Sequence, residues 1–284
     1  MRSRERGAGM TTLTRPRLVP AEGGPAPSIR DHAAIGDGRT VALVTLDGTI
    51  NWLCLPDLDS PSIFGALLDA ERGGSFTLRP DVPYAMSRRY LPSTNVLETT
   101  FQTAAGSVRV IDAMTLPDDV ALVPARELCR RIEPVDGAVP MRWTVSPRFG
   151  YGRDRVATGS RYDVPVATAG NLAIAVNSWD AGTPVVTPAS VQGRFIARRA
   201  ATIALSVAFQ EPLVLPGRND VERRLAETTA YWRDHAAAGS YGGPWRDPVE
   251  RSALALKLLV FAPSGALAAA ATTSLPETLG GERN

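Results

Sequence analysis

Alternation of apolar and polar residues with a period of two is the feature that most constrains the fold of this chain. It is clearest in residues 141–145, 172–176 and 203–209. This alternation is typical of strands that are half buried in antiparallel sheets. Turn signals separate such runs at the spacing of a sandwich, at Ala105-Gly106, Asp136-Gly137 and Ala169-Gly170. Because no alternation of strands with helices appears, residues 29–215 predict an antiparallel β-sandwich in a mainly β protein.

Two local signals predict elements near the start of this region. Residues 41–55 read as a hairpin around Asp47-Gly48, a pair favoured in tight turns in which both residues take positive φ. Ser60-Pro61 then precedes an apolar run. Because serine caps helices and proline suits their first position, we expect a short helix over residues 62–70.

The composition changes after residue 215, where two helices are predicted. Asn219 with Glu222 marks the start of an amphipathic helix. A second start at Asp247-Pro248 opens a helix over residues 248–262 that is apolar on nearly every face and ends before Gly265. Because such a helix must be surrounded, we expect it to need neighbours that residues 1–284 do not supply.

Composition and charge exclude several classes of protein. The chain has 284 residues and a formal charge of +2, and its arginines are scattered, so no nucleic-acid surface is expected. No run of about 18 uncharged apolar residues predicts a membrane span. Residues 1–28 lack the apolar segment of a signal peptide. We expect them to be a disordered extension, with Met10 as an alternative start to Met1, and the protein to be cytoplasmic.

No motif for a metal, a cofactor or a nucleotide is found. Cys54 and Cys129 lie in apolar segments and form no CxxC pair, so each is expected to act as a small hydrophobe. His32 and His235 lack a metal-like setting and are expected to be exposed. The Gly36–Arg39 segment lacks the lysine and following helix of a phosphate loop, and a tight turn explains it.

Glycoside hydrolysis needs two carboxyl groups, one to donate a proton and one to activate water or attack. The candidates are Glu98, Asp112, Glu127 and Glu277. Their spacing singles out no pair, so each is expected to be a solvated surface carboxylate. No serine-nucleophile motif G-x-S-x-G occurs either.

Several stretches, taken together and in order, resemble bacterial proteins of glycoside hydrolase family 15, the glucoamylase- and trehalase-like group. They include IRDHAAIGDGRTVALVTLDGTINWLCLPDLDSPSIFGALLD, YLPSTNVLETTF, PRFGYGR and GPWRDPVERSALALKLL, at residues 29–69, 90–101, 147–153 and 243–259, followed by residues 262–284. There are two departures: Ala271 replaces a usual proline, and 57–59 replaces a basic-aromatic pair.

The resemblance implies a super-β-sandwich joined by a linker helix to an (α/α)6 barrel that cleaves α-glucosidic bonds with inversion. The implied parts are a trehalase-like sandwich at 29–215, a linker helix at 216–242 and the truncated start of the barrel at 243–284. In such proteins both catalytic glutamic acids lie beyond the region matched here. We therefore expect no catalytic residue, cofactor or metal ligand in this chain.

The resemblance also implies that the loop after the last helix approaches the substrate, although an ordinary structural loop explains these residues as well. The candidate substrate-binding residues are Thr273, Ser274, Leu275, Pro276, Arg283 and Asn284.

Three hypotheses follow for function. The favoured one is the N-terminal portion of a truncated glycosidase, inactive alone, which would take trehalose or an α-glucan only once the barrel is complete. The second is a non-catalytic sandwich that binds α-glucan or a partner through exposed aromatics such as Trp179 and Tyr162. The third is a split enzyme, in which a downstream polypeptide, or a second copy, covers helix 248–262. The sequence leaves open whether the sugar is trehalose or a longer glucan.

Overall fold

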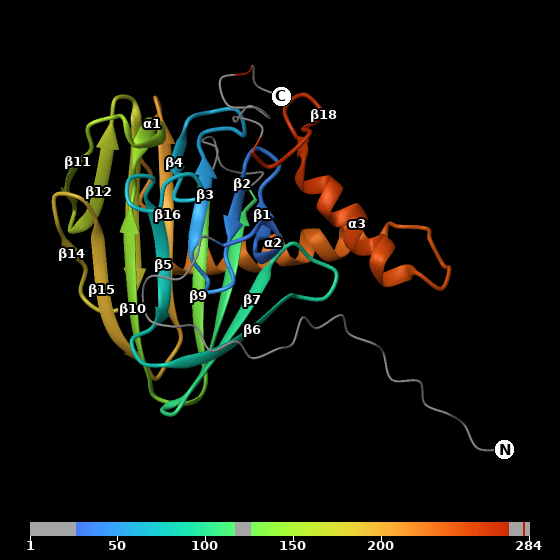
Figure 1. Cartoon of the computed structure of the whole chain (residues 1–284), viewed down its shortest axis with the longest axis horizontal. Helices are drawn as coiled ribbons and strands as arrows, with labels where there is room; N and C mark the ends of the chain where they lie inside the picture. Colours follow the sequence, from blue (N-terminus) through green and yellow to red (C-terminus); the bar gives the residue numbers. More distant parts are fainter. Residues whose placement is uncertain (1–26, 117–125, 273–280, 282–284) are drawn as a thin grey trace.

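A computed structural model describes residues 27–116, 126–272 and 281, and its main body is a sandwich of two antiparallel sheets (Figure 1). The first sheet has the strand order β1-β2-β3-β5-β10-β15-β14, with β4 paired to β3 at one end. Its strands are β1 (Ala33–Gly36), β2 (Val41–Val44), β3 (Ile50–Cys54), β4 (Ser62–Phe64), β5 (Ser75–Pro80), β10 (Val139–Ser146), β14 (Val185–Val186) and β15 (Val191–Ala197).

The second sheet has the order β11-β12-β13-β16-β9-β8-β7-β6. Its strands are β6 (Tyr84–Tyr90), β7 (Leu97–Thr103), β8 (Gly106–Thr115), β9 (Arg126–Gly137), β11 (Ala157–Arg161), β12 (Val164–Ala169), β13 (Leu172–Trp179) and β16 (Ala201–Phe209). Outside the sheets lie a 3-10 turn η1 (Ile29–Asp31), helices α1 (Phe149–Gly152), α2 (Arg218–Ala237) and α3 (Arg246–Leu258), and a small hairpin, β17 (Val260–Phe261) with β18 (Ala266–Leu267).

The main core fills the space between the two sheets, as the period-two alternation predicts. In β10 the apolar residues Met141, Trp143 and Val145 are buried, whereas the residues between them are half-buried. The Trp143 indole N–H donates to the carbonyl of Ala181 at 2.8 Å, so its polar group is satisfied inside the core. The predicted antiparallel sandwich is confirmed.

The predicted hairpin at residues 41–55 is also confirmed, with β2 paired antiparallel to β3. Its turn differs from the expectation. Gly48 has a φ of 77°, but Asp47 does not take positive φ, because the turn runs over Thr45 to Thr49 and closes with Gly48 N–H on the Thr45 carbonyl at 3.1 Å. One left-handed residue is enough for a turn of this length.

The predicted short helix at 62–70 is wrong. Ser62–Phe64 is strand β4, paired with β3, and the chain then continues in turns. Ile63 and Phe64 are fully buried in the main core, and side chains of this kind favour a pleated, packed surface. Pairing with β3 and burial in the core therefore override the helix-start signal of Ser60-Pro61.

Helix α2 covers the outer face of the second sheet, behind which it runs in Figure 1. The predicted apolar stripe is found, with Val221, Leu225, Thr228 and Trp232 buried. The helix begins at Arg218, and the Asp220 carboxylate accepts the N–H of Gly217 at 3.2 Å. The start is thus one residue earlier than Asn219, within the usual variation of helix ends.

This cover changes the environment of the central strand β16. Its residues 201–208 are all buried, whereas the alternation predicted a half-buried strand. Ile203 and Leu205 face the main core, while Ala204 belongs to the second apolar cluster, together with Val221 and Leu225 of α2. Small residues on the outer face let α2 approach closely, and this burial on both faces was missed.

Helix α3 packs on the sandwich through one face only. Leu254 and Leu258 are buried, whereas Leu256 is 55% exposed and Val249 39% exposed. Part of the apolar surface of the helix is therefore not covered by the described residues. Arg251 fixes the helix, because its guanidinium donates to the carbonyl of Thr94 at 2.8 Å and lies over the Tyr90 ring at 4.1 Å.

The bounds of α3 differ from the predicted 248–262. The helix begins at Arg246, and Pro248 lies in its first turn, where a missing N–H costs no hydrogen bond. It ends at Leu258 because Val260 and Phe261 pair with Ala266 and Leu267 in a hairpin. β-branched and aromatic residues favour this strand pairing.

Candidate functional site

The hairpin after α3 is held against the first sheet at one end of the sandwich. The N–H of Ala262 donates to the carbonyl of Gly38 at 2.7 Å, and the Arg39 guanidinium lies 5.7 Å from the centre of the Phe261 ring. Further along, the indole N–H of Trp52 donates to the carbonyl of Ala271 at 3.3 Å. Together these contacts fix the segment that leads to the predicted substrate loop.

Residues 36–39 form the tight turn between β1 and β2 that the sequence predicts. Asp37 Oδ1 accepts the N–H groups of Arg39 and Thr40, both at 2.9 Å. Asp37 is buried, and this burial raises the pKa of its carboxyl above the ordinary value, although the two N–H donors oppose the shift. The segment has a structural role, because it carries the carbonyl that holds the hairpin.

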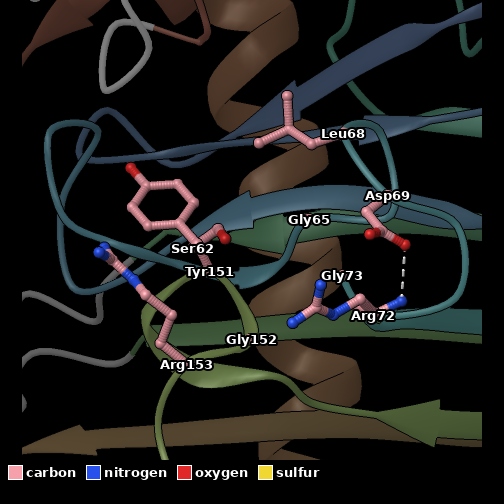
Figure 2. A pocket seen from close by; sticks show the side chains of 9 residues that line it. All are labelled: Ser62, Gly65, Leu68, Asp69, Arg72, Gly73, Tyr151, Gly152 and Arg153. Atoms are coloured by element: carbon pink, nitrogen blue, oxygen red, sulfur yellow. Dashed lines mark hydrogen bonds between the residues drawn. The ribbon is translucent and has the colours of Figure 1, made fainter. Parts of the chain in front are cut away.

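A cavity of about 210 Å³ lies beside this end of the sandwich (Figure 2). The chain between β4 and β5 forms one wall and α1 forms the other. The lining residues are Ser62, Gly65, Leu68, Asp69, Arg72, Gly73, Tyr151, Gly152 and Arg153. The walls are joined by backbone, since the N–H of Arg148 donates to the carbonyl of Ile63 at 2.8 Å.

The α1 wall has an uncommon backbone conformation. Gly150, Tyr151 and Gly152 all have positive φ, of 58°, 60° and 76°, so α1 is a left-handed turn and not a regular helix. A tyrosine in this region costs on the order of 1–3 kcal/mol and persists only where its surroundings fix it. The conformation carries the Tyr151 ring to the cavity, where Arg153 lies 5.8 Å from its centre.

The opposite wall supplies polar groups of different kinds. Asp69 Oδ1 accepts the N–H groups of Glu71 and Arg72 at 3.0 and 2.9 Å. Ser62 is fully buried, yet its Oγ has no hydrogen-bond partner among the described residues. In Figure 2 the Ser62 hydroxyl lies between the Tyr151 side and the Asp69–Arg72 side of the cavity. A buried hydroxyl without a partner is uncommon and costs stability.

The cavity and the segment after α3 are neighbours through two aromatic rings. The Tyr151 ring lies 6.4 Å from the Trp52 ring, centre to centre, and Trp52 binds the carbonyl of Ala271. One ring therefore separates the cavity from the segment that approaches residue 273.

The predicted substrate-binding residues lie outside the described part of the chain. They are Thr273, Ser274, Leu275, Pro276, Arg283 and Asn284. The structure describes the chain that precedes them, up to residue 272. Ala271, which departs from the family pattern, packs against the second apolar cluster and supplies the carbonyl that Trp52 binds.

The candidate carboxylates Glu98, Asp112 and Glu127 are buried, so the expectation of solvated surface groups is wrong for all three. Each is paired with arginine: Glu98 with Arg89 at 2.7 Å, Asp112 with Arg130 at 2.8 Å, and Glu127 with Arg224 at 2.6 Å. Their positions in strands, facing arginines on neighbouring elements, explain the burial. Carboxylates held in this way support the fold. Glu277 lies outside the described residues.

The cysteines and histidines are placed as structural residues. Cys54 and Cys129 are both buried, as expected for small hydrophobes, and burial raises the pKa of the Cys129 thiol well above its ordinary value. The histidines were expected to be exposed, but both are half-buried, and His32 bonds to the Ser28 carbonyl and the Asn51 amide, each at 3.0 Å. Within residues 27–116 and 126–272, no cluster of histidine, cysteine and carboxylate groups suits a metal ion.

The aromatics proposed for a binding face differ in exposure. Trp179 is half-buried and packs against the second apolar cluster, so its expected exposure is wrong. Tyr162 is 93% exposed in the turn between β11 and β12. These two residues do not form a common surface, because α2 and its cluster cover Trp179.

The cavity was missed by sequence reasoning, although its two walls belong to stretches that carried the resemblance, residues 29–69 and 147–153. The available signal was glycine: Gly65, Gly73 and Gly152 all line the cavity. A side chain at Gly73 would overlap the backbone of Gly65, and one at Gly152 would meet the Arg72 carbonyl at 2.7 Å. Glycine is required where two chain segments approach this closely.

Comparison with known proteins agrees with this architecture. The family model described as "Trehalase-like, N-terminal" matches residues 17–183. A two-sheet sandwich that carries this match defines the class of the protein, and the chain belongs to the trehalase-like family.

Three curated relatives are each a trehalase. The chain is 33% identical to that of Mycobacterium tuberculosis over 92% of its own length and 41% of the relative. It is 32% identical to that of Mycolicibacterium smegmatis, over 99% of the chain and 46% of the relative. It is also 32% identical to that of Thermoplasma volcanium, over 91% of the chain and 42% of the relative. The chain thus spans less than half the length of the curated relatives that it matches.

No helix within residues 27–116 and 126–272 combines the length and the apolar character needed to cross a membrane.

Proposed function

We propose that this chain is the N-terminal portion of a trehalase-type glycoside hydrolase of family 15, with trehalose as substrate of the complete enzyme. The observation that carries the proposal is the family match over the sandwich together with three trehalase relatives. The division into a sandwich at 29–215, a linker helix at 216–242 and the start of a barrel from 243 belongs to this proposal.

In this proposal the chain positions the catalytic part and does not itself cleave the sugar. The two carboxyl groups that inverting hydrolysis requires belong to the length of the relatives that the chain does not span. The buried carboxylates Glu98, Asp112 and Glu127 support this view, since each is held by an arginine and does not face the cavity. Thr273–Pro276, Arg283 and Asn284 stay our predictions for substrate contacts.

The exposed face of α3 supports a contact with further polypeptide. Leu256 and Val249 are exposed, and Trp245 beside the helix start is 67% exposed. Exposed apolar side chains on one helix face mark an interaction surface. We propose that the catalytic part covers this face, as a continuation of the chain or, in the split-enzyme version, as a separate polypeptide.

A chimera tests the proposal. Residues 1–284 replace the matched 41% of the Mycobacterium tuberculosis trehalase, and glucose release is measured from trehalose and from maltose. We expect hydrolysis of trehalose. A folded chimera that releases no glucose from trehalose contradicts the proposed role of this chain in positioning the catalytic part.

A further inference from the structure

We propose that the cavity between β4 and α1 is a binding site for one glucosyl unit, separate from the residues that cleave the sugar. The proposal rests on the proposed function for the identity of the sugar. The cavity itself stands on the positions of Ser62, Asp69, Arg72 and Tyr151.

The size of the cavity suits a single sugar ring. Its volume is about 210 Å³, and it is open to solvent on the side where Asp69, Arg72 and Arg153 are exposed. This space suits a monosaccharide unit and is too small to enclose a disaccharide. A second unit of the same sugar would extend from the cavity toward solvent.

The Tyr151 ring supplies the apolar surface that a pyranose needs. Its backbone shares the left-handed conformation of the glycines on both sides, and the Trp52 ring, 6.4 Å away centre to centre, packs beside the Tyr151 ring. A rigid aromatic side chain presents a large contact area at low entropic cost. Arg153 packs against the same ring and donates to the Gly150 carbonyl at 3.1 Å, which supports the ring further.

The polar groups match a neutral molecule that both donates and accepts hydrogen bonds. The Ser62 hydroxyl belongs to the wall but does not reach a ligand, because it is completely buried. Asp69 uses Oδ1 for two backbone N–H groups, and no hydrogen bond between described residues uses Oδ2, so this oxygen can accept from a sugar hydroxyl. The Arg72 guanidinium, which forms no ion pair within the described ranges, donates.

The same set disfavours an anion. Arg72 and Arg153 alone would attract a phosphate, but the Asp69 carboxylate lines the same small cavity and repels one. A neutral polyol makes use of the carboxylate, whereas a phosphate does not. The mixture of one carboxylate, guanidinium groups and an aromatic ring therefore favours a sugar.

The test measures binding of trehalose and glucose to the purified chain 1–284 by NMR titration, with inorganic phosphate as a third probe. We expect millimolar dissociation constants for both sugars and shifts centred on Gly65, Gly73, Tyr151 and Gly152. Tyr151→Gly removes the ring while glycine retains the backbone freedom that a φ of 60° requires, and should weaken binding about tenfold or more. Arg72→Ala, which removes an exposed guanidinium that lines the cavity, should weaken binding and leave the melting temperature nearly unchanged.

Tyr162→Gly is the matched control, because Tyr162 also has positive φ, of 48°, but lies in the β11–β12 turn. It should leave binding unchanged. The proposal is overturned by the absence of sugar-induced shifts at concentrations up to about 100 mM, a hundredfold above a millimolar constant. Equal weakening of sugar binding by Tyr151→Gly and Tyr162→Gly also overturns it. So does phosphate, if it binds more tightly than the sugars and binds more tightly still to Asp69→Asn. None of these measurements involves hydrolysis, so failure here is distinct from failure of the proposed function.

Discussion

The ion pair of Asp112 with Arg130 joins the two sheets inside the sandwich. Both side chains are completely buried. Besides the carboxylate, the Arg130 guanidinium donates to the carbonyl of Phe76 at 3.2 Å and to that of Gly48, and it lies 4.8 Å from the centre of the Phe76 ring. Asp112 and Arg130 belong to the second sheet, whereas Phe76 and the Gly48 turn belong to the first. One arginine therefore fixes the distance between the sheets.

Removal of this arginine should destabilise the protein strongly. Arg130→Leu leaves the Asp112 carboxylate buried without a partner, which costs about 3–5 kcal/mol. The double variant Asp112→Leu with Arg130→Leu should lose less, because no uncompensated charge remains. Urea unfolding of the three proteins measures this difference. A double variant that is less stable than Arg130→Leu would show that the carboxylate has another partner.

Asp37 gives a prediction about pH. Burial raises the pKa of its carboxyl in the folded state above the ordinary value of 3.8. The unfolded chain therefore loses this proton first, and the carboxyl lowers the stability of the fold progressively as the pH rises from below 3.8 through the folded-state pKa. Asp37→Asn keeps an oxygen for the N–H groups of Arg39 and Thr40 but has no charge.

We expect the melting temperature of Asp37→Asn, relative to the unchanged protein, to increase between pH 3.5 and pH 7. Thermal unfolding across this range measures it, with Asp163→Asn in the exposed β11–β12 turn as the control. A relative melting temperature that falls as the pH rises would contradict the assigned direction of the shift.

At the residue scale, the sequence predicted which side chains are apolar core but not which charges are buried. Glu98, Asp112 and Glu127 read as ordinary strand carboxylates, because their arginine partners are 9, 18 and 97 residues away. No local pattern reveals a partner at that separation. Ser62 was missed for the same reason, since its unpartnered hydroxyl depends on where α1 packs.

At the scale of elements, α3 offers the sharpest contrast between two neighbouring leucines. Leu258 is 3% exposed and packs in the second apolar cluster, whereas Leu256 is 55% exposed. Leu258→Ala should cost about 2–5 kcal/mol for the docking of α3, and Leu256→Ala should lie within about 0.5 kcal/mol of zero in this chain. Hydrogen exchange of the α3 amides measures both.

If Leu256→Ala speeds up hydrogen exchange of the α3 amides as much as Leu258→Ala does, the assigned packing face is contradicted. In the chimera with the trehalase, we expect Leu256 to matter as well. There Leu256→Glu should lower the yield of active enzyme, because the proposed partner surface covers this residue.

Elements were predicted correctly where one local pattern dominated, as in the β2–β3 hairpin and the stripe of α2. They were wrong where long-range pairing decided the outcome. Residues 62–64 have a good helix-start signal, but β3 offers them a strand partner and the core buries them. The end of α3 was placed too late, because the β17–β18 pairing and the Gly38 carbonyl that binds Ala262 lie outside any helical pattern.

At the scale of the whole molecule, the two-sheet sandwich followed from alternation and turn spacing, but its assembly with α2, α3 and the hairpin did not. The segment after the hairpin and α1 meet at the end of the sandwich where Trp52 binds the Ala271 carbonyl and Tyr151 lies beside Trp52. The arrangement places a cavity and the approach to the predicted substrate loop on the same end. We infer that this end faces the catalytic part of the enzyme.

The contact of Trp52 with Ala271 is testable in that setting. Trp52→Phe keeps the buried ring largely filled but removes the N–H that holds the carbonyl. We expect a modest loss of stability in this chain, about 1 kcal/mol, and a larger relative loss of trehalose hydrolysis in the chimera, because the loop after Ala271 is less well positioned. Loss of stability without any change in hydrolysis would contradict the positioning role.

The most direct test of the central claim is glucose release from trehalose by the chain 1–284 alone and by the same chain joined to the unmatched part of the Mycobacterium tuberculosis trehalase. The account predicts background release from the chain alone and clear hydrolysis by the joined protein. Hydrolysis of trehalose by the chain alone would contradict the placement of the catalytic carboxylates outside it. A folded joined protein that leaves trehalose intact would contradict the assigned function.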